Sequence, residues 1–194
     1  MSARVPSSLF VTIVLSLGLV VSAVPRAARA ASASGHLSIG YSKLFVTNAP
    51  GGSLSIGGGV DIPAFENVRA GLDLGFHLLG SRTVVRGSLF TNVDYSLFEA
   101  VAFAHWTPEN LGPIGRVSIG PGLMNARADL SSSGGGVAFS DLAVSDFAPG
   151  VALDVTLIKR APALVKVGFV AGVRFAFLSD DTWKIATARL TFHY

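Results

Sequence analysis

The sequence contains no cysteine, which excludes a disulfide framework, thiolate metal centres and thiol redox chemistry. Charged residues are scarce as well, at 14% of the 194 residues, while 50% of the residues are hydrophobic. A soluble globular domain of this length ordinarily carries more charge. We therefore expect that part of the protein surface contacts something other than water.

A long uncharged apolar run, Leu9–Val21, lies near the amino terminus. Small residues at Ala28 and Ala30 then match the positions that a signal peptidase recognises. Pro25 and the arginines beside it keep the apolar run below the roughly 20 residues that a spanning helix needs, although an uncleaved anchor is the alternative. We predict that residues 1–30 are a cleaved secretory signal peptide and that residues 31–194 form the mature domain.

The formal net charge of +3 belongs to the predicted signal peptide. Arg4, Arg26 and Arg29 account for three of the 15 basic residues, so 12 basic residues remain against 12 acidic residues. The mature chain is then neutral and lacks the clustered basic surface that phosphate binding requires. The sequence predicts no nucleic-acid partner.

From about residue 36 onwards, apolar residues alternate with small or polar residues in runs that end at Gly, Pro, Asn, Asp or Ser. This period of two is typical of β-strands with one face in an apolar medium. We predict eight strands, near residues 36–46, 54–62, 69–78, 96–106, 116–123, 150–157, 165–177 and 183–194. The segments Leu79–Tyr95 and Leu130–Ser145 are predicted to be long surface loops.

The charged residues share a face with the glycines, and the other face is apolar. A soluble lipocalin-like barrel, the alternative, has the opposite polarity. We therefore predict an all-β fold, an eight-stranded antiparallel up-and-down transmembrane β-barrel in the cell outer membrane.

The predicted inward face carries charges of both signs, and an unpaired charge in a narrow lumen is strongly disfavoured. We therefore predict a closed, ion-paired lumen. Nine inward glycines favour the alternative of an open cavity or conduction path. The predicted lumen charge network comprises Asp61, Arg69, Asp73, Glu99, Arg116, Asp154, Lys166, Arg174 and Arg189.

Pro121 and Pro149 fall on neighbouring predicted strands, where each removes a backbone donor and should mark a bulge or a local gap. A lateral gate toward the membrane at these two prolines is a hypothesis. Aromatic residues near the strand ends, among them Trp106 and Trp183, are predicted to form the interfacial girdle.

At the carboxyl terminus Leu190, Phe192 and Tyr194 share one face, and this resembles the signal that outer-membrane barrels present to the barrel assembly machinery. The segment Ser96–Leu123 resembles small outer-membrane β-barrel domain proteins, a family with OmpA-like, OmpX-like and OmpW-like members and some lipid A enzymes. We predict a structural or interaction role in the manner of OmpA or OmpX, because the charge-filled lumen favours it. The alternative is an OmpW-like transporter or channel for small hydrophobic molecules, and a lipid-modifying outer-membrane enzyme comes third.

The sequence contains few patterns that are typical of catalytic or metal-binding sites. His36 and Ser38 have the spacing of a lipid A 3-O-deacylase motif, but they lie on the first strand, where that family does not carry it. We therefore predict no enzymatic activity, no cofactor and no metal. The predicted partners are outer-membrane lipids, the barrel assembly machinery and, under the transporter alternative, a small hydrophobic ligand. The protein is predicted to be a monomer.

Overall fold

The computed structural model describes residues 33–46, 49–87, 89–108, 114–134, 137–158 and 166–194. The predicted signal peptide, residues 1–30, lies outside the described residues, so its cleavage stays a prediction. In the described part of the chain, no helix is long and apolar enough to cross a membrane.

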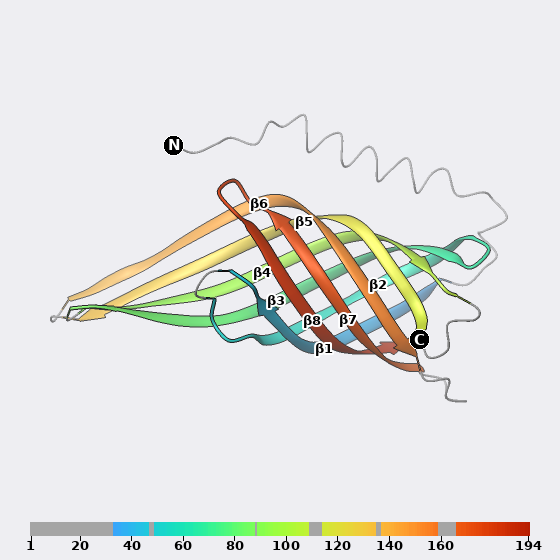
Figure 1. Ribbon diagram of the computed structural model, residues 1–194, viewed down its shortest axis with the longest axis horizontal. Helices are drawn as coiled ribbons and strands as arrows, with labels where there is room; N and C mark the ends of the chain where they lie inside the picture. The colour runs from blue at the N-terminus through green and yellow to red at the C-terminus, as the bar shows by residue number, and fades with distance from the viewer. Residues whose placement is uncertain (1–32, 47–48, 88, 109–113, 135–136, 159–165) are drawn as a thin grey trace.

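The eight strands form one closed barrel in which each strand pairs antiparallel with the next (Figure 1). They are β1 (Ser34–Leu44), β2 (Ser53–Phe65), β3 (Val68–Arg86), β4 (Leu89–Trp106), β5 (Ile114–Gly134), β6 (Val137–Ile158), β7 (Lys166–Phe177) and β8 (Thr182–His193). The ring closes between β1 and β8, in a register that runs from His36 opposite His193 to Leu44 opposite Ile185. The predicted eight-stranded up-and-down barrel is therefore confirmed.

The wall of the barrel has the polarity that the sequence predicts. On β3 the outward side chains Leu72, Leu74 and Phe76 are exposed, whereas the inward Asp73 and His77 are buried. The same alternation is found on the other strands, because successive side chains of a strand point to opposite faces. The outer wall is therefore apolar and the lumen wall is polar, as in a barrel whose outside contacts lipid.

Four neighbouring strands are much longer than the others. β3 to β6 have 19, 18, 21 and 22 residues, whereas β1, β2, β7 and β8 have 11 to 13. The predicted loops Leu79–Tyr95 and Leu130–Ser145 were wrong, because β3 pairs with β4 as far as Arg86 and β5 pairs with β6 as far as Gly134. Alternation continues there with reversed polarity, so a search for outward apolar residues does not detect it.

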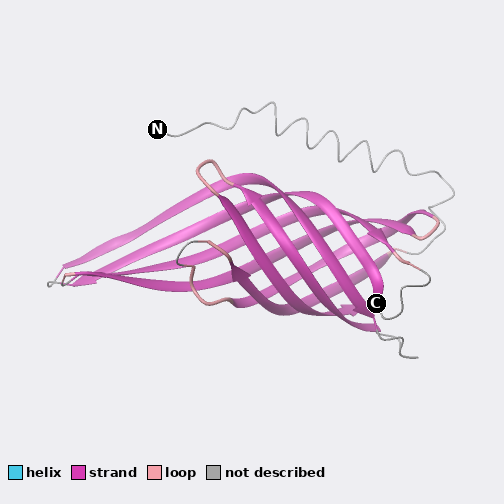
Figure 2. Cartoon of the chain, viewed as in Figure 1, coloured by secondary structure: helices cyan, strands magenta, loops and turns pink. Residues whose placement is uncertain are grey.

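The extra length forms a four-stranded sheet that continues past one end of the barrel, where the strands taper to a common tip (Figure 2). Pairing of β3 with β2 ends at His77, and pairing of β6 with β7 extends only to Gly150. A bulge between Leu78 and Gly80, with a φ of 89° at Gly80, marks the departure of β3. We call residues 80–86, 89–96, 127–134 and 137–149 the projecting sheet.

Candidate functional site: the filled lumen and the projecting sheet

The centre of the lumen is occupied by one arginine that bridges two carboxylates. Arg174 of β7 donates from Nε to Glu99 Oε2 of β4 at 2.8 Å and from Nη1 to Asp154 Oδ1 of β6 at 2.7 Å. His77 Nε2 lies 3.2 Å from Glu99 Oε1, and Arg189 Nη2 donates to Asp154 Oδ2 at 3.0 Å. The arginine side chain is fully buried. These contacts join strands from opposite sides of the barrel.

A second group of ion pairs lies toward the end of the lumen near Ser34. Asp61 pairs with Arg69 and lies 3.7 Å from Arg116 Nη1. Asp73 Oδ2 lies 3.2 Å from His36 Nε2. Eight of the nine predicted lumen charges therefore meet partners of opposite sign or a histidine, which satisfies buried charges that would otherwise be costly.

Lys166, the ninth charge, has a different position. Its side chain is exposed at the end of β7, where it lines an open cavity of about 320 Å³ together with Asp61, Arg69 and Arg116. Because Lys166 lies at the mouth of the lumen, solvent reaches its ammonium group and the group needs no buried ion-pair partner.

Three histidines also belong to the lumen network. Besides His36 and His77, His105 is buried, and its Nδ1 lies 2.8 Å from the hydroxyl oxygen of Ser118. All three occupy inward positions in the alternation of β1, β3 and β4. Among the described residues, no three His, Cys, Asp or Glu side chains are placed to hold a metal ion.

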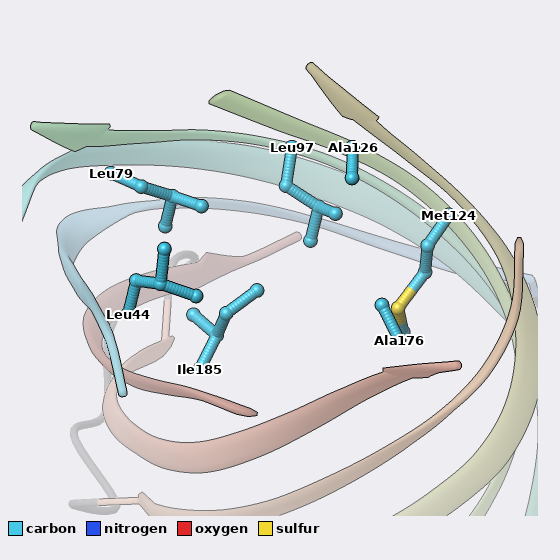
Figure 3. Close-up of a cluster of buried hydrophobic side chains, with 7 residues drawn as sticks. All are labelled: Leu44, Leu79, Leu97, Met124, Ala126, Ala176 and Ile185. Carbon is cyan, nitrogen blue, oxygen red and sulfur yellow. The ribbon is translucent and has the colours of Figure 1, made fainter. Parts of the chain in front are cut away.

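An apolar cluster lies inside the barrel at the other end of the lumen, next to the projecting sheet (Figure 3). Its buried members are Leu44, Leu79, Leu97, Met124, Ala126, Ala176 and Ile185. Trp183 packs against this cluster from inside the barrel, so its prediction as a girdle residue was wrong. Trp106 is exposed on the outer wall. The cluster residues lie at inward positions of their strands, so the alternation of residues in the sequence could have identified them.

Neighbouring side chains and backbone atoms occupy the space beside the inward glycines, and at several of them the neighbour is a carboxylate. A Cβ added to Gly75 would lie 2.8 Å from Glu99 Oε1, and one added to Gly172 would overlap Asp154 Oδ1. Glycine is therefore needed at these positions for the charged network to fit. A cavity between His36, Asp73 and Arg116 measures about 10 Å³, room for about one water molecule.

Gly172→Ala should therefore destabilise the barrel by about 1 to 3 kcal/mol, because the methyl group would displace Asp154 or the carbonyl of Leu153, 2.8 Å away. The free energy of unfolding in urea measures the effect. Gly51→Ala is the matched control, since nothing lies within 4 Å of its Cβ. Equal stability of the two variants would contradict the packing described here.

The two prolines lie at interruptions of the neighbouring ladders. Pro121 sits where pairing between β4 and β5 is missing, between the pairs Val101–Gly122 and Ala104–Ile119. Pro149 directly precedes Gly150, where pairing of β6 with β7 stops. Pairing between β5 and β6 runs without a break past both prolines. A lateral gate at these positions stays a prediction.

The outward face of the projecting sheet is mostly polar, with Val85, Phe90 and Phe147 as its large apolar residues. Asp94 and Asp129 lie opposite each other, and Arg127 Nη2 pairs with Asp129 Oδ1 at 2.7 Å. Its hydrogen bonds with Asp129 raise the pKa of the Arg127 guanidinium. The polar outward residues are Ser81, Thr83, Asn92, Asp94, Ser96, Arg127, Asp129, Ser131 and Ser145. Water solvates polar residues of this kind, so the lipid-facing part of the outer wall ends below this face.

The inner face of the projecting sheet, which continues the lumen wall, is apolar. Its apolar residues are Val84, Val93, Tyr95, Ala128, Leu130, Leu142 and Val144. Leu142 is 62% exposed and Val144 is 55% exposed. The polarity of the wall therefore reverses between the barrel and the projecting sheet.

The outward residues of the last strand include the predicted assembly signal. Leu190, Phe192 and Tyr194 are exposed on the outer wall, on the same face. Their recognition by the assembly machinery stays a prediction.

The closed ring of eight antiparallel strands, with an apolar outside and a polar inside, defines an eight-stranded outer-membrane-type β-barrel. Among solved structures, the chain is similar to Ail, the attachment invasion locus protein of Yersinia pestis, with a TM-score of 0.55 and 10% identity over 84% of this chain and 99% of that chain. It is also similar to Neisserial surface protein A, with a TM-score of 0.50 and 13% identity over 83% of this chain and 95% of that chain. At these identities the similarity shows the fold alone. No protein-family model and no curated protein matches the sequence.

Proposed function

We propose that the protein is an outer-membrane barrel with a structural or interaction role, whose lumen is closed. The observation that carries the proposal is the filled lumen, in which the ion pairs around Arg174 and the apolar cluster around Leu97 follow one another along the axis. An eight-stranded barrel has an interior that side chains can just fill. The buried charged side chains of the lumen pair with one another or with a histidine, and the proposed role includes no catalytic activity.

The orientation follows from the lengths of the connections. β2 and β3 are joined at one end of the barrel by a short turn at Glu66 and Asn67, and the projecting sheet lies at the other end. Outer-membrane barrels have short turns on the periplasmic side and longer segments outside. We place the projecting sheet outside the cell, where it meets external partners, and the lipid-facing wall among the outer-membrane lipids.

Conductance in planar bilayers tests the closed lumen. We expect the purified barrel to give no discrete current steps, because the charged pairs and the apolar cluster block the axis in series. Steps whose size changes in the variant Arg174→Met would show conduction through the lumen and would overturn the proposal. Protein that has been unfolded by heat before addition controls for leakage caused by damaged material.

A further inference from the structure

The inner face of the projecting sheet needs an explanation beyond the closed lumen. Its residues Leu142 and Val144 are exposed, whereas the outward residues Asp129 and Ser145 beside them are polar. An apolar sheet face beside a polar one is typical of a surface that is covered when the protein works.

This face is continuous with the apolar cluster at the end of the lumen. Tyr95, on the inner face, contacts Trp183 with ring centroids 5.9 Å apart. From Leu97 in the cluster to Val93 the chain advances four residues along β4, about 13 Å at 3.3 Å per residue. The continuous surface therefore has the length of a medium hydrocarbon chain.

The inner face has an acidic residue close to the barrel and a basic residue farther out. At the base, Asp146 accepts hydrogen bonds from the backbone N–H and the hydroxyl of Ser179, at 3.1 and 3.0 Å. Farther out, Arg82 lies in the same cross-strand row as Val93. Its guanidinium pairs with no side chain among the described residues. An apolar strip with a cation beside it, in the row of Val93, complements an apolar chain with an anionic end.

We propose that the inner face binds a free amphiphile with one hydrocarbon chain and an anionic headgroup. The chain lies along Tyr95, Leu130 and Val144, and the headgroup meets Arg82. This inference rests on the proposed function, because the apolar cluster that closes the lumen is the base of the binding surface. A second copy of the chain fits less well. Most of the residues on β4 and β5 are already half-buried, so the face offers little of the about 800 Å² that each partner of a stable interface buries.

The experiment uses the barrel in phosphatidylcholine nanodiscs and measures quenching of Trp183 by brominated dodecanoate. The variant Trp106→Phe leaves Trp183 as the single reporter, and Trp183→Phe leaves Trp106 on the lipid-facing wall to report probe that has only partitioned into the bilayer. We expect saturable quenching of Trp183 and linear, non-saturable quenching of Trp106.

Two variants in the Trp106→Phe background locate the site. Leu130→Asn should weaken binding about tenfold, because it replaces buried apolar contact, whereas Ser131→Asn, its neighbour on the outward face, should have no effect. Arg82→Gln should weaken binding of brominated dodecanoate about two- to fivefold and leave brominated dodecanol unchanged. An unchanged emission spectrum of Trp183 without probe confirms that each variant is folded.

Several results would overturn the proposal. Quenching of Trp183 that never saturates, or that is equal in Leu130→Asn and Ser131→Asn, would show partitioning alone. Quenching by brominated phosphatidylcholine within the nanodisc would assign the face to bilayer lipid, and dimers without probe-dependent quenching would assign it to a second copy. None of these results changes the conductance, so failure of this inference is separable from failure of the closed-lumen proposal.

Discussion

Replacing Arg174 by Met should destabilise the barrel by about 3 to 5 kcal/mol, the range for breaking a buried ion pair by removing one partner. The guanidinium makes charge-assisted hydrogen bonds to both Glu99 and Asp154. Methionine fills a similar volume but leaves Glu99 with His77 as its neighbouring base. Unfolding by urea in lipid vesicles, followed by tryptophan fluorescence, measures the change.

Two further variants separate the buried charge from lost packing. Glu99→Gln together with Arg174→Met should recover part of the lost stability, because the double variant removes the uncompensated carboxylate. Arg127→Ala, which breaks an exposed pair on the projecting sheet, should not change stability measurably. If the double variant were less stable than Arg174→Met, packing rather than charge would explain the loss.

The sequence was sufficient to predict the barrel and the inward direction of its charges. A period of two assigns every side chain to a face once the apolar face is assigned to lipid, and this placed Asp73, Glu99 and Arg174 inside. The same periodicity could not predict which charges pair. Glu99 and Arg174 are 75 residues apart and meet across the lumen, and their approach depends on strand tilt and stagger, which no local pattern encodes.

The projecting sheet was missed for a different physical reason. In the membrane, apolar residues must point outward, whereas in water the outward face is free to be polar. Val93 and Asp94 alternate as regularly as Leu74 and Gly75 do, but with the opposite sign. A pattern with apolar residues pointing outward therefore ends at the membrane boundary, although the strand itself continues beyond it.

That reversal of polarity predicts a large difference between two identical substitutions on the outward face of β3. Leu74 lies midway along the apolar outward stretch of this strand and is exposed. Leu74→Arg should cost about 2 to 4 kcal/mol, the range for an arginine that faces lipid at the bilayer midplane. Ser81→Arg, on the same face but in the projecting sheet opposite Asp94, should cost between about 0 and 1 kcal/mol.

Urea unfolding of both variants in vesicles gives the two free energies, and the same pair in detergent micelles provides the control for intrinsic strand effects. In micelles, which deform around a charge more readily than a bilayer, the difference between the two variants should shrink. A large cost at Ser81, or no cost at Leu74, would contradict the placement of the membrane around the barrel below the projecting sheet. The inner face that we assign to an amphiphile would then lie at the depth of the lipid chains, and its apolar residues would need no ligand to cover them.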